Sequence, residues 1–234
     1  MTAVSPPVIE RLTAGGVVKI CGLREPEHAV AAAKAGADLL GFIFAPARRR
    51  VRPEQAGRCI EAARRAAGAG RSLLAVGVFV DASADEIAET AREAGLDLVQ
   101  LHGAEPPGFA ATLPVPTIKA LKPRSLAPFA ETTEAATAYF SMARPPVALL
   151  IDGYHPTSAG GSGARADWGL ASVITPRWPM LLGGGLTPEN VGEAIREVRP
   201  LGVDVSSGVE RDGVKESELI VAFVDAAKAA FERR

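Results

Sequence analysis

The stretch Val17-Val18-Lys19-Ile20-Cys21-Gly22 is an apolar run that ends in a thiol and a glycine. A short run rich in β-branched residues indicates a β-strand, and the glycine indicates the turn that ends it. A second run, residues 147–151, delivers the carboxylate of Asp152 to a glycine turn in the same way. In a barrel of parallel strands the carboxyl ends of the strands face the active site. These two strand ends therefore predict a thiol and a carboxylate that act as an acid–base pair.

The pattern of an apolar run followed by a helical segment recurs along the chain. Strands that alternate with helices indicate a parallel sheet, and eight strands close a (β/α)8 TIM barrel. A doubly wound open sheet is the alternative fold, because counting strands does not exclude it. Strands are expected near Val17-Cys21, Leu39-Phe44, Leu74-Val80, Leu98-Leu101, Thr117-Leu121, Val147-Asp152, Met180-Gly183 and Val203-Ser206. Helices are expected over Pro26-Ala35, Pro53-Ala67, Ala84-Ala94, Leu126-Ala138, Pro188-Val198 and Ser217-Phe231, with short ones near residues 106–112 and 167–174.

The ends of the domain and of two helices carry their own signals. Residues 1–16 show no clean period, so we expect a tail or a short helix there and one barrel domain over residues 17–234. Ser83, with Glu86 three residues later, predicts a helix N-cap. Thr187-Pro188 places a proline where a helix begins, which predicts that Pro188 lies in the first helical turn.

The composition is that of a globular protein without a dominant charge. Of the 234 residues 47% are hydrophobic, and 26 basic against 27 acidic side chains leave a net charge of −1. No global field therefore favours nucleic acid or an anionic membrane. The apolar runs are far shorter than the roughly 20 residues of a membrane helix, and no signal pattern opens the chain, so we expect a cytoplasmic protein. Two cysteines make no disulfide framework, and Cys59 is expected to be structural.

Cys21 is the sharpest candidate for chemistry. A thiol acts as a base only when it is ionised, so its ordinary pKa of about 8.5 must fall or substrate binding must favour the thiolate. Lys19 points to the same side of the strand and is expected to supply positive potential. A buried core cysteine is the alternative interpretation, because free cysteine is often buried.

Two further strand ends carry titratable side chains. Asp152 is expected to lie partly desolvated at the barrel mouth, where it would serve as a proton donor. His102, in Gln100-Leu101-His102-Gly103, closes another strand. A turn or N-cap aspartate and a turn histidine are the alternatives. The three histidines of the chain are scattered and have no metal-ligand spacing, so no metal site is expected.

Glycine-rich and arginine-rich segments suggest how a substrate would be held. Gly183-Gly184-Gly185 and Ser206-Ser207-Gly208 follow the seventh and eighth strands, where barrels of this type commonly bind phosphate through backbone N–H groups. Gly160-Gly161-Ser162-Gly163 has the composition of a lid. Arg48-Arg49-Arg50 and Arg52 follow the second strand, and one of them is expected to bind a carboxylate.

Ordered blocks of sequence after Gly16 carry a resemblance to a known family. They are Lys19-Ile20-Cys21-Gly22-Leu23, Gly41-Phe42-Ile43-Phe44, Val76-Gly77-Val78-Phe79-Val80, Val99-Gln100-Leu101-His102-Gly103, Gly160-Gly161-Ser162-Gly163 through Asp167-Trp168, Gly184-Gly185-Leu186-Thr187-Pro188-Glu189-Asn190-Val191, and Val203-Asp204-Val205-Ser206-Ser207-Gly208-Val209-Glu210. In these blocks the chain resembles phosphoribosylanthranilate isomerase, a (β/α)8 enzyme of tryptophan biosynthesis.

The resemblance implies a reaction and the residues that perform it. The substrate would be N-(5-phosphoribosyl)anthranilate, which an Amadori rearrangement converts to the carboxyphenylamino-deoxyribulose phosphate. Cys21 would be the general base and Asp152 the general acid, with no cofactor. The resemblance also implies substrate contacts at Arg49, His102, Asp204, Gly161, Ser162 and Gly163, and phosphate contacts at Gly184, Gly185, Ser206, Ser207 and Gly208.

One departure from the family pattern concerns the arginines. The segment from Ala47 to Pro53 is one residue shorter than is usual in the family, so counting back from Pro53 selects Arg49 for the anthranilate carboxylate. Counting forward from Pro46 selects Arg50, and that alternative stays open.

Other functions and assemblies are weighed against this one. A related isomerase of histidine biosynthesis, or a dual-specificity enzyme, is expected to carry an aspartate where this chain has Cys21. A non-catalytic barrel that binds a phosphorylated ligand, or that assembles with another enzyme, would not need both Cys21 and Asp152. The expected partner is a small phosphorylated substrate rather than nucleic acid or a membrane, and both a monomer and a homodimer remain possible.

Overall fold

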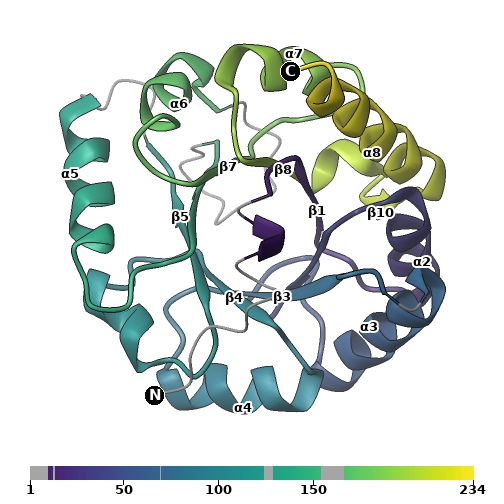
Figure 1. Ribbon diagram of the computed structural model, residues 1–234. Coiled ribbons are helices and arrows are strands. Elements are labelled where there is room, and N and C mark those ends of the chain that lie inside the picture. Colours follow the sequence, from purple (N-terminus) through teal and green to yellow (C-terminus); the bar gives the residue numbers. More distant parts are fainter. Residues whose placement is uncertain (1–9, 13, 69, 124–128, 154–165) are drawn as a thin grey trace.

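The computed structural model describes residues 10–12, 14–68, 70–123, 129–153 and 166–234. It is a closed barrel of parallel strands surrounded by helices (Figure 1). The strands are β1 (Val17–Cys21), β2 (Leu39–Ile43), β3 (Leu74–Phe79), β4 (Leu98–Leu101), β5 (Thr117–Leu121), β6 (Ala148–Ile151), β7 (Met180–Leu182) and β8 (Gly202–Val205). Because β8 pairs with β1, the sheet has no open edge, which confirms the predicted TIM barrel and excludes the doubly wound alternative.

The helices follow the strands in the predicted order. They are α2 (Pro26–Ala35), α3 (Pro53–Ala67), α4 (Ala84–Ala94), α5 (Phe129–Phe140), α6 (Trp168–Ile174), α7 (Val191–Val198) and α8 (Ser217–Glu232), with 3₁₀ helices η1 (Pro107–Thr112) and η2 (Ser207–Val209). Among the described residues, no helix is both long and apolar enough to span a membrane.

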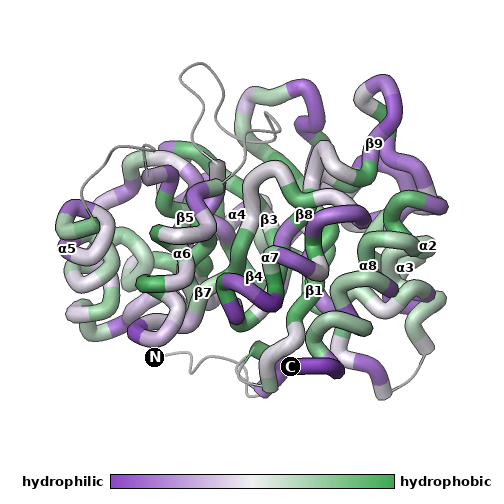
Figure 2. Tube along the Cα trace, turned by 90° about the horizontal axis from the view of Figure 1, so that it is seen from above, coloured by the Kyte–Doolittle hydropathy of each residue, from purple (hydrophilic) through white to green (hydrophobic). Residues whose placement is uncertain are grey.

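Two apolar layers hold the barrel together. Strand residues alternate between the inside of the barrel and the helices around it, because successive side chains point to opposite faces. The inner layer is lined by one set of residues, among them Val17, Leu39 and Leu150, and the outer layer packs the other face of the sheet against the helices. Figure 2, a side view, shows the hydrophobic colouring concentrated along the strands. The parity of each strand therefore decides which side chains reach the interior.

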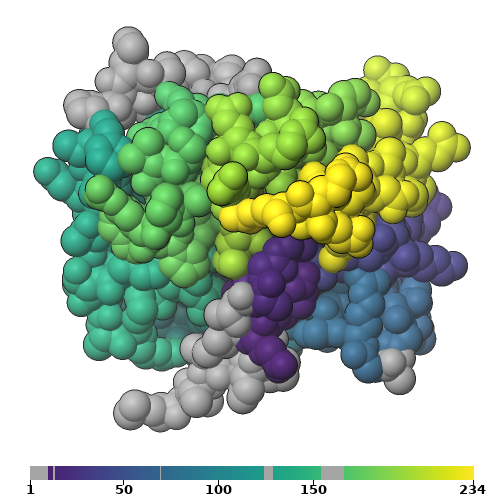
Figure 3. All heavy atoms as spheres, turned by 45° about the horizontal axis from the view of Figure 1, so that its top comes forward, coloured from purple at the N-terminus to yellow at the C-terminus, as the bar shows by residue number. Residues whose placement is uncertain are grey.

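The amino-terminal end of the barrel is closed by residues that are distant in the sequence. Residues 10–12 are helical, and Leu12 is buried in the inner apolar layer. Asp38 accepts hydrogen bonds from Arg11 Nε at 2.9 Å, from the Val18 backbone N–H at 2.9 Å and from Lys228 Nζ at 2.9 Å. Figure 3 shows the purple amino-terminal residues against the yellow α8. This network joins β1, the segment before β2 and α8.

One predicted helix start is confirmed and one is wrong. Ser83 Oγ accepts a hydrogen bond from the Glu86 N–H at 3.2 Å, which is the predicted N-cap. Pro188 is not in the first turn of α7, because that helix begins at Val191. The reason is Asn190, whose Oδ1 accepts from the Thr187 N–H at 2.8 Å and whose Nδ2 donates to the Gly185 carbonyl at 2.9 Å. These bonds hold residues 185–190 as a loop and delay the helix.

A small hairpin follows η2 at the carboxyl-terminal end of the barrel. Its strands are β9 (Glu210–Arg211) and β10 (Val214–Lys215), which pair antiparallel. The turn between them is Asp212-Gly213, with φ values of 50° and 80°. Asp-Gly suits such a turn because both central residues need positive φ. The hairpin brings Glu210 and Lys215 together beside the end of β8.

Candidate active site

The carboxyl ends of the strands bring the predicted acid and base into the barrel interior. Val17 lies in the inner apolar layer, so Lys19 and Cys21 point to the same side. Leu150 is an inner residue of β6, so Asp152 follows it on the inner side. Strand β6 is third from β1 in the barrel order, through β8 and β7. The thiol and the carboxylate therefore stand at one mouth on separate strands.

Gly41 makes room for the thiol. It is the register partner of Cys21 in the ladder between β1 and β2. A Cβ atom at Gly41 would lie 2.8 Å from Cys21 Sγ and 3.0 Å from Cys21 Cα. Any larger residue at this position would push the thiol away from its place.

Cys21 is buried beside a lysine–aspartate ion pair. Lys19 Nζ lies 2.9 Å from Asp204 Oδ1, on the neighbouring strand β8, where the two residues are register partners. Burial raises the pKa of the Cys21 thiol above its ordinary value, Lys19 lowers it, and Asp204 raises it, with a net rise. The Cys21 thiol therefore ionises less readily than a cysteine in water. Cys59 is the second free cysteine, and its burial in α3 confirms the structural expectation.

Asp152 lies next to His102, as two strand ends converge. Asp152 Oδ1 accepts a hydrogen bond from the Gly153 N–H at 2.8 Å, and its Oδ2 lies 3.4 Å from His102 Nε2. On the other side of the imidazole, Gln100 Nε2 lies 2.8 Å from His102 Nδ1. With the amide donating, Nδ1 accepts and Nε2 carries the proton that faces Asp152. Gln100 thus orients the histidine toward the carboxyl group.

Arg49 is buried in this end of the barrel, whereas Arg50 is exposed. Arg49 forms a two-pronged ion pair with Glu210, with Nε–Oε1 at 2.5 Å and Nη2–Oε2 at 2.7 Å. Arg48 also donates to Glu210 Oε2, at 2.9 Å. A Cβ at Gly22 would lie 2.7 Å from Arg49 Cδ, so this arginine passes directly over the turn after Cys21. Arg49 therefore lies beside the predicted base, whereas Arg50 lies at the surface.

The loops after β7 and β8 pack tightly against each other. Gly184 and Gly185 have φ values of 80° and 66°, which glycine adopts without strain. A Cβ at Gly208 would lie 1.8 Å from the Leu186 carbonyl oxygen, so only a glycine allows this approach. Ser206 Oγ is buried and has no hydrogen-bond partner among the described residues. This hydroxyl fits a polar ligand held between the two loops.

Three predicted substrate contacts lie outside the described residues. They are Gly161, Ser162 and Gly163 of the predicted lid. Two other predicted contact residues are described. Ser207 is the first residue of η2, and Asp204 forms an ion pair with Lys19.

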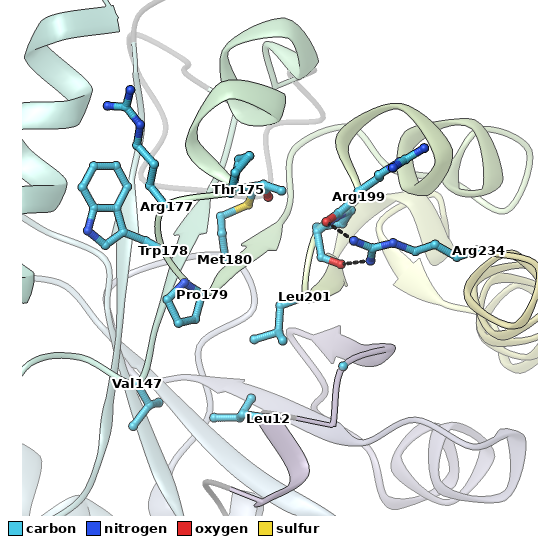
Figure 4. Close-up of a pocket in the computed structure, with 13 residues that line it drawn as sticks. Leu12, Val147, Thr175, Arg177, Trp178, Pro179, Met180, Arg199, Leu201 and Arg234 are labelled. Carbon is cyan, nitrogen blue, oxygen red and sulfur yellow. Dashed lines mark hydrogen bonds between the residues drawn. The ribbon is translucent and has the colours of Figure 1, made fainter.

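A cavity of about 520 Å³ lies at the opposite end of the barrel (Figure 4). Its walls come from the segments that precede β6, β7 and β8, including Val147, Trp178 and Leu201. Arg234 closes one side by donating to the Pro200 and Arg199 carbonyls at 2.8 and 2.6 Å. Active sites of TIM barrels lie at the carboxyl ends of the strands, so the cavity is separate from the chemistry.

Sequence reasoning missed four residues that build the site. Gly41 and Gln100 stood inside quoted motifs without a role, and they act through register and through hydrogen bonding. Glu210 and Lys215 flank Asp212-Gly213. That dipeptide is a hairpin signal, and it predicts that the flanking residues lie side by side.

The fold and the arrangement at its carboxyl end are those of the (β/α)8 barrel enzymes. The sequence profile of N-(5'phosphoribosyl)anthranilate (PRA) isomerase matches residues 18–226, so the chain belongs to this family of isomerases.

Individual relatives agree with this assignment along nearly the whole chain. An N-(5'-phosphoribosyl)anthranilate isomerase of Roseiflexus castenholzii is 46% identical over 216 residues, 92% of this chain and 99% of that protein. A crystal structure of PRA isomerase in complex with reduced 1-(o-carboxyphenylamino)-1-deoxyribulose 5-phosphate has a TM-score of 0.74 and 33% identity, covering 91% of this chain and 98% of that one. Monomers generated from the dimeric isomerase of Thermotoga maritima give a TM-score of 0.73 and 32% identity, with the same two shares covered.

Because of Glu210, the free energy of unfolding is expected to fall as the pH becomes acidic. Burial raises the pKa of the Glu210 carboxyl, but Arg49 and Lys215 lower it by more. The net result is a fall from 4.5 to about 2. A carboxyl whose pKa is lowered by folding stabilises the folded state at pH values above its unfolded-state pKa. This contribution is lost as the pH falls from 4.5 toward about 2. The shift corresponds to at most about 3 kcal/mol. We expect Glu210→Gln to lower the free energy of unfolding at pH 7 and to flatten its decline between about pH 5 and 2.

Urea unfolding across this pH range measures the effect. Glu89→Gln, at an exposed position of α4, is the matched control and should leave the curve unchanged. Parallel curves for Glu210→Gln and the parent would contradict the assignment.

Proposed function

We propose that this chain catalyses the Amadori rearrangement of N-(5'-phosphoribosyl)anthranilate to 1-(2-carboxyphenylamino)-1-deoxyribulose 5-phosphate, with Cys21 as general base and Asp152 as general acid. The chain is an isomerase of tryptophan biosynthesis, in accord with its family. The observation that carries the two roles is the convergence of the strand ends. Cys21 and Asp152 face the same barrel mouth, and each has a polar side chain beside it: Lys19 on the same face of β1, and His102 with Nε2 at 3.4 Å from Asp152 Oδ2.

The reaction begins with two proton transfers, one to the ring oxygen and one from C2, both of which are bonded to C1. Asp152 donates a proton to the furanose ring oxygen, the C1–O bond breaks, and the lone pair of the anthranilate nitrogen forms the C1=N iminium. Cys21, as thiolate, then removes the proton from C2, and the electron pair of the C–H bond moves toward the cationic nitrogen. The resulting enolamine becomes the ketone when the C2 hydroxyl loses its proton and C1 gains one. Substrate atoms are rearranged and none is lost.

The substrate is held by its two charged ends. Arg49 binds the anthranilate carboxylate through the guanidinium N–H groups that lie outside its two bonds to Glu210. The backbone N–H groups of Gly184, Gly185, Ser207 and Gly208 and the hydroxyl of Ser206 bind the phosphate. His102 and Asp204 complete the walls, and Gly161, Ser162 and Gly163 complete the contacts from the loop after β6. Two anchors at the ends of the molecule leave C1 and C2 between the acid and the base.

The cellular location and the oligomeric state of the enzyme are part of the same proposal. A cytoplasmic location is supported by the two free cysteines, since thiols stay reduced there. The functional unit is a monomer or a homodimer, and the substrate is a small molecule rather than nucleic acid.

A fluorescence assay tests the function directly. Freshly made phosphoribosylanthranilate is fluorescent, and its loss on addition of the protein measures turnover. The phosphoribosyl isomerase substrate of histidine biosynthesis, run in parallel, separates the proposed activity from its relative. Turnover of the histidine-pathway substrate alone would overturn the proposal.

Replacing Asp152 by asparagine should abolish turnover and leave substrate binding largely intact. The amide keeps the shape of the side chain but has no proton to give to the ring oxygen. General acid catalysis contributes roughly 10²–10⁴-fold, so kcat should fall by at least about 10²-fold. Steady-state kinetics and product-analogue binding measure the two effects. A variant that keeps more than about a tenth of the parent kcat would assign the acid to another group.

Cys21→Ser should lower activity by at least about 10²-fold, because a serine hydroxyl does not ionise in the working pH range. Iodoacetamide should inactivate the parent enzyme, and a bound product analogue should protect it. Cys59→Ser is the matched control and should change neither activity nor inactivation. The base is wrongly assigned if Cys21→Ser stays active and Cys59 is the thiol whose alkylation stops turnover.

Arg49→Ala should raise KM strongly while changing kcat less. A carboxylate remote from the reacting carbon is bound alike in the ground state and the transition state. Arg50→Ala, at an exposed position, is the control and should be mild. If the two variants behave the other way round, the carboxylate is bound by Arg50.

A further inference from the structure

Two lysines are buried at the catalytic end of the barrel, and the proton transfers described above use neither. Lys19 is fully buried, and Lys215 is 6% exposed. Removing an ammonium group from water is costly unless a partner compensates it. The charges of both lysines act on Cys21, the residue that has to carry a negative charge in the proposed reaction.

Lys19 stands directly below the thiol on β1. The two residues are separated by one position, so their side chains leave the same face of the strand. The ammonium is fixed by Asp204 at 2.9 Å, and its charge lowers the pKa of the neighbouring thiol. Burial lowers the pKa of Lys19, but Asp204 and Cys21 raise it by more, so Lys19 stays protonated.

Lys215 approaches from the hairpin after β8. Its Nζ donates to the Ser206 carbonyl at 2.7 Å and to Glu210 Oε1 at 2.9 Å. The Ser206 side chain in turn borders the turn after Cys21, because a Cβ at Gly22 would lie 3.1 Å from Ser206 Oγ. Burial lowers the pKa of Lys215 below its ordinary value, and Glu210 and the Cys21 thiolate offset only part of this shift. A thiolate at Cys21 therefore favours the charged form of Lys215, and the reverse also holds.

The charges around the thiol do not cancel. Lys19 is balanced by Asp204, but Glu210 alone faces Lys215, Arg49 and Arg48. This one carboxylate and three cations leave a net positive charge around Glu210, in the hairpin beside the end of β8. Lys19 is the largest influence that opposes the burial of the thiol, and Lys215 acts in the same direction. The site is electropositive where the base must become an anion.

We propose that Lys19 and Lys215 are positioning residues that serve as the counter-ions of the Cys21 thiolate. Asp204 and Glu210 hold the two ammonium groups in place by ion pairs at 2.9 Å, and each carboxylate favours the charged form of its lysine. The base of the reaction is then a thiolate between two lysines rather than an isolated cysteine. This inference rests on the proposed role of Cys21, and the experiment below tests the ion pairing without substrate.

The experiment measures how the ionisation of Cys21 depends on pH. In a Cys59→Ser background Cys21 is the single thiol of the chain. The rate of its alkylation by iodoacetamide follows the thiolate fraction, so the midpoint of the rate against pH reports the ionisation. The ultraviolet absorbance of the thiolate, taken as the difference from Cys21→Ser in the same background, gives the midpoint even where the reagent has poor access.

We expect Lys19→Met to raise this midpoint by about one pH unit and Lys215→Met by about half a unit. At a pH well below the midpoint, these shifts mean about tenfold and threefold slower alkylation. Lys119→Met is the matched control, since Lys119 is an equally buried barrel lysine that pairs with Glu105 at 2.6 Å. It loses a comparable ion pair on the far side of the barrel, so the midpoint should not move.

A double variant separates the lysine from its partner. Lys19→Met alone leaves the charge of Asp204 uncompensated, which also disfavours a thiolate. In Lys19→Met/Asp204→Asn that charge is gone, and we expect the midpoint to stay above the parent value. A return to the parent midpoint would show that Lys19 only neutralises Asp204 and would overturn its role.

The remaining outcomes are equally decisive. A midpoint within about 0.2 units of the parent in either lysine variant overturns the assignment of that lysine. An equal shift in Lys119→Met overturns both, because it traces the effect to lost stability. If Cys21→Ser stays active while the lysine variants shift the midpoint, the ion pairing stands and the proposed base is wrong.

Discussion

The pairing of β8 with β1 is the constraint on which the rest of the site depends. It joins the last strand to the first and places Asp204 beside Lys19 at the same level of the barrel. Without closure, the thiol at the end of β1 would lie at an exposed edge, and the hairpin after β8 would have no neighbour. Closure also fixes the parity of every strand, so that Cys21, His102 and Asp152 all turn inward. One hydrogen-bonded ladder thus decides the electrostatics of the catalytic mouth.

The same closure explains the burial of so many charged groups. Lys19, Lys119 and Arg49 are all buried polar residues of the barrel's carboxyl half. Each has a carboxylate partner from a different strand or loop, namely Asp204, Glu105 and Glu210. A buried charge with its partner removed is strongly destabilising. Of these pairs, Lys19–Asp204 lies inside the barrel toward the catalytic end, whereas Lys119 leaves the outer face of β5, and the interior is apolar toward the end closed by Leu12.

The elements of the fold could be predicted because their signals are local. Helices α2, α3 and α4 begin and end at the predicted residues, where a proline or a serine opens them and a glycine follows. The start of α7 could not be predicted from Pro188, because two hydrogen bonds of the Asn190 side chain compete with the helix. The positions of Cys21 and Asp152 at strand ends could be predicted for the same reason, since each follows an apolar run. The roles of Glu210, Lys215 and Gln100 depend on contacts between distant segments, which a periodic pattern does not record.

The contact between Gly208 and the Leu186 carbonyl has a thermodynamic consequence. At this approach the loops after β7 and β8 have no room to move independently, so they form one rigid cradle. The conformational entropy of ordering them is lost when the chain folds, and a ligand that bridges them loses little more. Binding to such a preorganised surface is governed by the exchange of water for ligand at the exposed N–H groups. Substitution of Gly208 would separate the two loops. Each binding event would then have to order them again, and this loss of entropy would weaken binding.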